Sequence, residues 1–154
     1  MKEVVLKLIE NHKTISTMES CTGGGVANAI TNIEGSSEIL KFSAVTYSNE
    51  FKIKMGVNKD VIDKYTVYSM ETANEMSKNI SLFTNSDYGI GITGKLNRID
   101  KNNLVGSNNK VFISIYNKEK DEYLQSTIIV DKNSREENKK LVLEEIKRVL
   151  NNVL

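Results

Sequence analysis

The stretch "MESCTGGG", residues 18–25, places a serine and the chain's one cysteine directly before three consecutive glycines. It follows "TISTM", residues 14–18, where apolar and polar residues alternate as they do in a β-strand. After it, "GGVANAITNI", residues 24–33, reads as a helix of small residues. We therefore expect a strand that turns sharply into a helix, with glycines supplying the turn conformations. In open α/β sheets, such turns lie at the carboxyl ends of strands, where ligands bind.

Helical and strand patterns alternate outward from this turn. Val4, Val5, Leu8 and Ile9 have helical spacing and predict a first helix that ends near Lys13. Later strands are predicted at 39–48, 86–93, 110–117 and 122–130, and later helices at 49–56, 58–65, 69–80 and 133–154, with Ser69 and either Asn133 or Ser134 as N-caps. The segment "NKEKDE" joins the last two strands as a hairpin connection. The sequence thus predicts one domain over residues 1–154, a three-layer α/β/α fold with a mixed, mostly parallel sheet and a late β-hairpin.

Composition and charge exclude several classes of protein. The 154 residues are 39% hydrophobic and 27% charged, as in an ordinary globular domain. The net charge of +1 provides no field to attract nucleic acid or an anionic membrane, so neither is expected as a partner. No apolar run reaches the roughly 18 residues needed to span a bilayer, and the N-terminal segment does not resemble a signal peptide. We expect a cytoplasmic protein in which Cys21, the only cysteine, is reduced.

The sequence offers few ligands for a metal ion. Its single histidine, His12, falls near the end of the first predicted helix, where it reads as a polar residue at a helix end. No Cys/His pair has metal-binding spacing, and no acidic cluster suggests magnesium. We therefore expect no metal and no cofactor.

Ser20 is the first candidate for chemistry, because free N–H groups at a helix start suit an anion or the oxyanion of acyl transfer. A serine nucleophile needs a base, and no histidine lies in a suitable loop. A buried lysine can serve because desolvation lowers its pKa. Tyr47 lies at the end of the strand predicted at 39–48 and Lys52 just after it, and this strand end lies on the same rim as Ser20. The alternatives are a turn shaped only for backbone geometry, a solvated Lys52, and Cys21 as a small buried hydrophobe.

Six motifs together resemble the CinA C-terminal domain family in order and spacing. They are "ESCTGG" (19–24), "GSS" (35–37), "VTYSNEFK" (45–52), "MGV" (55–57), "YSMETANEM" (68–76) and "GITG" (91–94). The resemblance extends from about Lys13 to the last helix. Many family members carry a separate N-terminal domain, so this chain is similar to the stand-alone form. The characterised enzymes of the family are nicotinamide-nucleotide amidohydrolases, which implies hydrolysis of nicotinamide mononucleotide to nicotinic acid mononucleotide and ammonia, without a metal.

The resemblance implies a role for each matching residue. Ser20 would be the nucleophile and Lys52 the base that accepts its proton, while Tyr47 would orient the pair by hydrogen bonding. Ammonia would leave with a proton from Lys52 or Tyr47, and water would then hydrolyse the acyl-enzyme.

Five further residues would bind the substrate. The backbone N–H groups around Thr22, Gly23 and Gly24 would stabilise the oxyanion. Thr93, in "GITG", matches a family position that faces the same pocket. Arg135 aligns with a family arginine suited to binding phosphate through its planar charged group, although alone it would read as a solvated surface residue.

One segment departs from the family pattern. After "TG" the family usually continues with a loop such as "IAGPGGG" and then "KPVGTV", whereas this chain reads "TGKLNRIDKNNLVGSNNKV". Lys95, Asn97 and Arg98 stand where the family has small residues, and they either hold a phosphate differently or are solvated. The departure implies a different substrate or a weakened activity.

Two readings follow from this departure. The first is an amidohydrolase acting on a pyridine nucleotide, which the presence of Ser20, Tyr47 and Lys52 favours. The alternative is a non-catalytic nucleotide-binding or regulatory module with an altered 94–106 loop. A direct role in DNA uptake, suggested by the competence-related family name, finds no basic stripe or groove-reading helix. A homo-oligomer is expected, because small α/β domains often place apolar surface in a dimer interface.

Overall fold

The computed structural model describes residues 1–154 and contains one five-stranded sheet in the order β2-β1-β3-β4-β5. The strands are β1 (Ile15–Glu19), β2 (Leu40–Val45), β3 (Tyr88–Gly94), β4 (Lys110–Asn117) and β5 (Glu122–Ile129). β1 pairs in parallel with β2 and β3, while β4 pairs antiparallel with β3 and β5. The mixed sheet and the late hairpin are therefore confirmed, with the strand pairs divided evenly between parallel and antiparallel.

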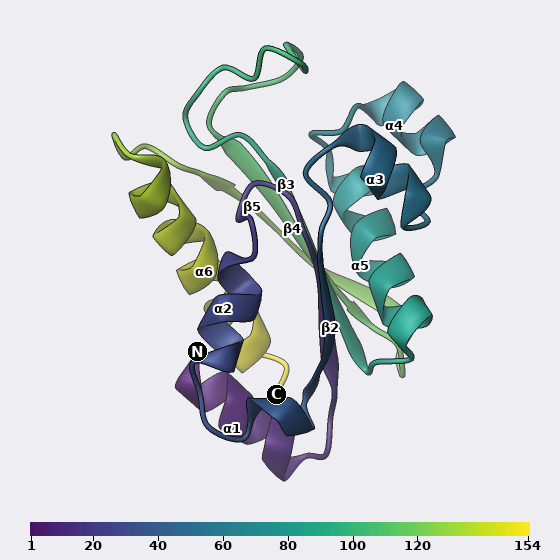
Figure 1. Cartoon of the computed structure of the whole chain (residues 1–154), viewed down its shortest axis with the longest axis vertical. Coiled ribbons are helices and arrows are strands. Elements are labelled where there is room, and N and C mark those ends of the chain that lie inside the picture. The colour runs from purple at the N-terminus through teal and green to yellow at the C-terminus, as the bar shows by residue number, and fades with distance from the viewer.

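Helices cover both faces of this sheet (Figure 1). On one face lie α1 (Lys2–Glu10), α2 (Gly25–Thr31) and α6 (Arg135–Asn151), and on the other α3 (Asn49–Lys54), α4 (Lys59–Tyr65) and α5 (Met70–Thr84). A short 3-10 helix, Ser36–Glu38, precedes β2. No helix is long and apolar enough to cross a membrane. The arrangement is the predicted three-layer α/β/α fold.

Several element ends differ from the sequence-based prediction. α1 ends at Glu10, before the predicted Lys13, and His12 adopts a left-handed φ of 53° just after it. β2 ends at Val45, which leaves residues 46–48 as a connection into α3. The predicted caps hold, since Ser69 accepts a hydrogen bond from the N–H of Thr72 and Ser134 begins α6 in the same way.

Successive side chains of β3 point to opposite faces of the sheet, so that each face contacts a different helix layer. Ile90 and Ile92 enter the larger apolar core, which the strands share with α1, α2 and α6. Gly91 faces α5, where an added Cβ would lie 2.3 Å from the backbone oxygen of Ala73. Only glycine therefore lets α5 pack against the backbone of β3 at this distance.

The parallel strands β1, β2 and β3 bring their carboxyl ends to one edge of the sheet. From this edge leave the turn into α2, the 46–48 connection into α3 and the long loop 95–109 between β3 and β4, which projects beyond the sheet (Figure 1). Because ligands bind at such edges, this is where a site is expected.

Candidate active site

Ser20 and Lys52 meet at the carboxyl edge of the sheet. Ser20 follows β1 directly, and Lys52 lies on α3, whose start is fixed by the Ser48 N-cap. The Lys52 Nζ donates hydrogen bonds to the Ser20 Oγ at 3.0 Å and to the Thr46 carbonyl oxygen at 2.8 Å. Lys52 is 1% exposed, and burial lowers the pKa of its ammonium to about 8. The pair thus combines a hydroxyl with an amine that can accept its proton near neutral pH.

A buried carboxylate shapes the turn that carries Ser20. The Glu19 side chain is fully buried and accepts hydrogen bonds from the Thr22 hydroxyl at 2.6 Å and the Gly24 N–H at 3.0 Å. It also accepts from the N–H groups of Val26 at 3.1 Å and Ala27 at 2.9 Å. The Glu19 side chain therefore caps the N-terminus of α2, and its negative charge is favourable at that end of the helix. The sequence prediction missed this role, because the hydrogen-bond donors reach Glu19 only once the turn has closed.

Of the predicted oxyanion donors Thr22, Gly23 and Gly24, the two glycines need correction, whereas the Thr22 N–H stays free. None of these residues lines the pocket, the Gly24 N–H is bound to Glu19, and the Gly23 N–H donates to the Ser20 carbonyl oxygen at 3.0 Å. Gly23 and Gly24 instead form the turn, with φ values of 62° and 91°. The backbone N–H groups of Cys21 and Thr22 make no hydrogen bond and are the donors still available next to Ser20.

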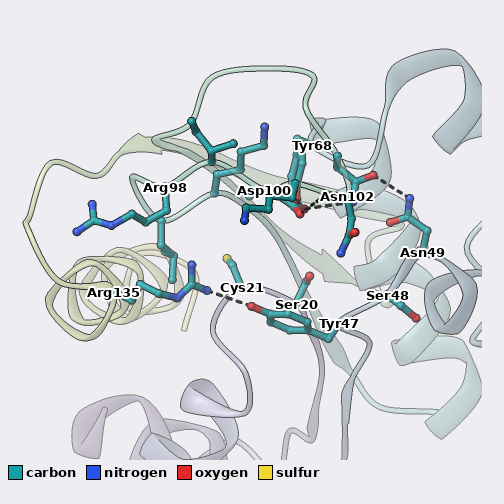
Figure 2. A pocket seen from close by; sticks show the side chains of 16 residues that line it. Ser20, Cys21, Tyr47, Ser48, Asn49, Tyr68, Arg98, Asp100, Asn102 and Arg135 are labelled. Carbon is teal, nitrogen blue, oxygen red and sulfur yellow. Dashed lines mark hydrogen bonds between the residues drawn. The ribbon is translucent and has the colours of Figure 1, made fainter.

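A cavity of about 490 Å³ opens above Ser20 (Figure 2). The Ser20 hydroxyl and the Cys21 sulfur point into it from one side, and the 94–103 segment forms the opposite wall. Its ionisable lining includes a single acid, Asp100, and four basic side chains, Lys95, Arg98, Lys101 and Arg135. The excess of positive charge suits an anionic ligand.

Tyr47 lines the pocket but does not orient the Ser20–Lys52 pair as predicted. Its side chain is 64% exposed, and its hydroxyl accepts a hydrogen bond from the Arg135 Nη2 at 3.1 Å (Figure 2). The Thr46 carbonyl holds Lys52 instead. Arg135, the first residue of α6, lines the pocket as predicted.

Thr93 does not face the pocket, which corrects a second prediction. It is fully buried and donates a hydrogen bond to the Val67 carbonyl oxygen at 2.8 Å. The strand alternation explains this, because Thr93 lies on the same side of β3 as Gly91, toward α5. Thr93 thus ties the segment before α5 to the sheet.

The sequence prediction missed a hydrogen-bonded cluster on the wall opposite Ser20. The Tyr68 hydroxyl donates to the Asp100 carboxylate, which also accepts from the Asn102 N–H at 2.9 Å and the Asn103 amide at 3.1 Å (Figure 2). Burial disfavours the ionised form of Asp100, but these three hydrogen bonds hold the pKa of its carboxyl below the ordinary value. The Asn49 amide, from α3, donates to the Asn103 side chain at 3.2 Å. No local pattern could signal this cluster, since Tyr68 and Asp100 lie far apart in the sequence.

Two basic side chains of the loop 95–109, Lys95 and Arg98, differ greatly in their exposure. Lys95 lines the pocket yet is only 3% exposed. Its Nζ lies 4.9 Å from the centre of the Tyr68 ring and 3.5 Å from the Asn108 Oδ1. Arg98 is exposed, and its guanidinium donates to the carbonyl oxygens of Asn97 and Asn133. Arg98 therefore connects the loop to the segment that enters α6.

Cys21 is a poor rival to Ser20 as a nucleophile. Its side chain is 4% exposed and belongs to the main apolar core, and burial raises the pKa of its thiol to about 12. The thiolate needed for attack is therefore strongly disfavoured. No group of three or more His, Cys, Asp or Glu side chains is arranged to hold a metal ion.

Comparison with known proteins gives consistent results. The family model described as the CinA C-terminal domain matches residues 1–154. A CinA-like protein of Endomicrobium trichonymphae is 48% identical over 88 residues, which are 56% of this chain and 21% of that protein. The match spans less than a quarter of the length of such curated relatives.

Two solved structures share the fold. A competence-damaged protein (CinA) superfamily protein of Escherichia coli aligns with a TM-score of 0.86 at 22% identity, over 99% of this chain and 87% of that chain. A competence or damage-inducible protein of Enterobacter asburiae aligns with a TM-score of 0.88 at 22% identity, over 99% of this chain and 95% of that chain. The architecture is therefore the one seen in these proteins.

Proposed function

Because the chain belongs to the CinA C-terminal domain family, we propose that it is a metal-independent amidohydrolase. The substrate is nicotinamide mononucleotide, and the products are nicotinic acid mononucleotide and ammonia. The observation that carries the proposal is the 3.0 Å hydrogen bond between the buried Lys52 amine and the Ser20 hydroxyl, at the floor of a pocket. A lysine kept only for solubility would be exposed, whereas Lys52 is 1% exposed and has no carboxylate within hydrogen-bonding distance.

The reaction begins with neutral Lys52. Its amine takes the proton of Ser20 as the Ser20 oxygen attacks the carboxamide carbon, giving a tetrahedral intermediate. The same proton passes from Lys52 to the nitrogen of the leaving group, the C–N bond breaks, and ammonia departs. Lys52 then removes a proton from water, and the resulting hydroxide attacks the ester carbon on Ser20. The ester C–O bond breaks, Lys52 returns that proton to the Ser20 oxygen, and the carboxylate product departs.

The negative oxygen of the intermediate needs hydrogen-bond donors close to Ser20. The backbone N–H groups of Cys21 and Thr22 have no other acceptor, so we assign the oxyanion to them. This assignment replaces Gly23 and Gly24, whose N–H groups are already bound.

The phosphate of the substrate is assigned first to Arg135. Its guanidinium lines the pocket and is positioned by the Tyr47 hydroxyl, and a guanidinium can bind phosphate through two parallel hydrogen bonds. Tyr47 thus serves as a positioning residue for Arg135 in this scheme.

The test is ammonia release from nicotinamide mononucleotide by the purified protein in the presence of a metal chelator. Wild-type protein should release ammonia, and Ser20→Ala should lose the activity while unfolding at the same temperature. Lys52→Met should lose it as well. Cys21→Ala is the matched control, and we expect it to retain most of the activity.

Failure of wild-type protein to release ammonia at high enzyme and substrate concentrations would contradict the proposal. The alternative, a non-catalytic nucleotide-binding module, draws its support from the loop that departs from the family pattern. If the protein released no ammonia but nicotinamide mononucleotide still raised its melting temperature, the non-catalytic module would be favoured.

A further inference from the structure

Lys95 is the second buried lysine at the pocket, and the proposed reaction does not use it. It is 3% exposed, whereas Lys101 of the same loop is exposed. Lys95 belongs to none of the ion pairs in the structure, which join other lysines and Arg148 to carboxylates. An ammonium group removed from water without a paired carboxylate is costly to the folded state.

The contacts that Lys95 makes leave most of its hydrogen-bonding capacity unused. The face of the Tyr68 ring at 4.9 Å offers electrostatic attraction, and the Asn108 Oδ1 at 3.5 Å offers at most one weak hydrogen bond. The nearby Asp100 carboxylate attracts the Lys95 charge but forms no ion pair with it, and it accepts its hydrogen bonds from Tyr68, Asn102 and Asn103. An ammonium group carries three donors, so at least two have no acceptor within the protein.

We propose that Lys95 binds the phosphate group of the substrate, so that this side chain and Arg135 together select a phosphorylated nucleotide over its riboside. The proposal deepens, and rests on, the function assigned above to the Ser20 site. Both side chains line the same pocket, and a phosphate accepts hydrogen bonds from both kinds of donor. Lys95 stands in the loop that departs from the family pattern, so this chain supplies phosphate-binding charge from a side chain there.

A purely structural role for Lys95 gives different expectations. If Lys95 only holds the loop against Tyr68, replacing it should loosen the wall of the pocket and impair every substrate equally. The loop would also melt more easily, and the melting temperature would fall. A phosphate-binding lysine instead discriminates between substrates, and its removal relieves a buried charge.

The experiment compares nicotinamide mononucleotide with nicotinamide riboside, which lacks the phosphate. In Lys95→Met, a neutral side chain of similar length, we expect the ratio of kcat/KM for the mononucleotide to kcat/KM for the riboside to fall about tenfold or more. The melting temperature should equal or exceed that of the wild type. Lys110→Met changes the exposed first residue of β4, which does not line the pocket, and it is the control that should keep the wild-type ratio.

A second readout does not need the proposed activity. Millimolar inorganic phosphate, compared with chloride at equal ionic strength, should raise the melting temperature of wild type and Lys110→Met more than that of Lys95→Met. An unchanged substrate ratio, or an equal phosphate response in all three proteins, would overturn the role of Lys95. If no protein releases ammonia from either compound, the amidohydrolase proposal fails, while the phosphate response still decides whether Lys95 binds the anion.

Discussion

At the scale of single residues, the contact between Ser20 and Lys52 could be predicted from the sequence better than the residues around it. Ser20 and Lys52 were predicted to meet, because a serine after one parallel strand and a lysine after the next share an edge of the sheet, and the structure places them 3.0 Å apart. Tyr47 is expected to orient this pair and instead binds Arg135, and Thr93 is expected to face the pocket and instead binds the Val67 carbonyl. Their directions depend on where β2 ends and on which side of β3 a residue lies, and one residue of error reverses the outcome.

The depressed pKa of Lys52 gives a prediction for the pH dependence. Lys52 must be neutral to accept the Ser20 proton, and burial lowers its pKa to about 8. Below that pH, kcat/KM for nicotinamide mononucleotide should rise about tenfold per pH unit, and above it kcat/KM should level off. A solvated lysine would place this rise near pH 10.

The measurement is a kcat/KM profile between pH 6 and pH 10, with circular dichroism at each pH to show that the fold persists. A profile that is flat, or that rises only near pH 10, would remove Lys52 as the base.

At the scale of elements, the turn from β1 into α2 is organised by Glu19 as much as by its glycines. One buried carboxylate accepts hydrogen bonds from three backbone N–H groups and the Thr22 hydroxyl, and it directly precedes Ser20. The glycine run indicated the turn, but the acid could not be assigned from sequence alone, since its partners depend on the turn being closed. The hydrogen-bond partners of Asp100, in the loop 95–109, could not be predicted either, because one of them, Tyr68, lies outside that loop.

We predict that Glu19→Gln destabilises the fold by about 3 kcal/mol, because an amide replaces one acceptor oxygen with a donor that faces backbone N–H groups. Chemical denaturation would measure the loss of unfolding free energy. The control, Glu10→Gln, changes an exposed glutamate in α1 and should stay within about 0.5 kcal/mol of the wild type. Equal stability of the two variants would show that the carboxylate does not hold the turn.

At the scale of the whole molecule, the three-layer fold brings distant parts of the chain to one pocket. Ser20, Tyr68, Lys95 and Arg135 come from four separate segments, and all four line it. The alternation of strand and helix patterns sufficed to predict the layers, because a sheet that is apolar on both faces needs helices to cover each face. The pocket wall could not be predicted, because it depends on contacts between loops. The expected homo-oligomer stays a prediction, which sedimentation velocity would test.

The most direct test of the central claim is to find the atom that attacks the substrate. Rapid quenching of the enzyme with nicotinamide mononucleotide, followed by peptide mass spectrometry, would locate the acyl-enzyme. The account predicts an adduct of the mononucleotide minus ammonia on Ser20, absent in Ser20→Ala together with turnover. An adduct on Cys21, or full ammonia release by Ser20→Ala, would contradict it.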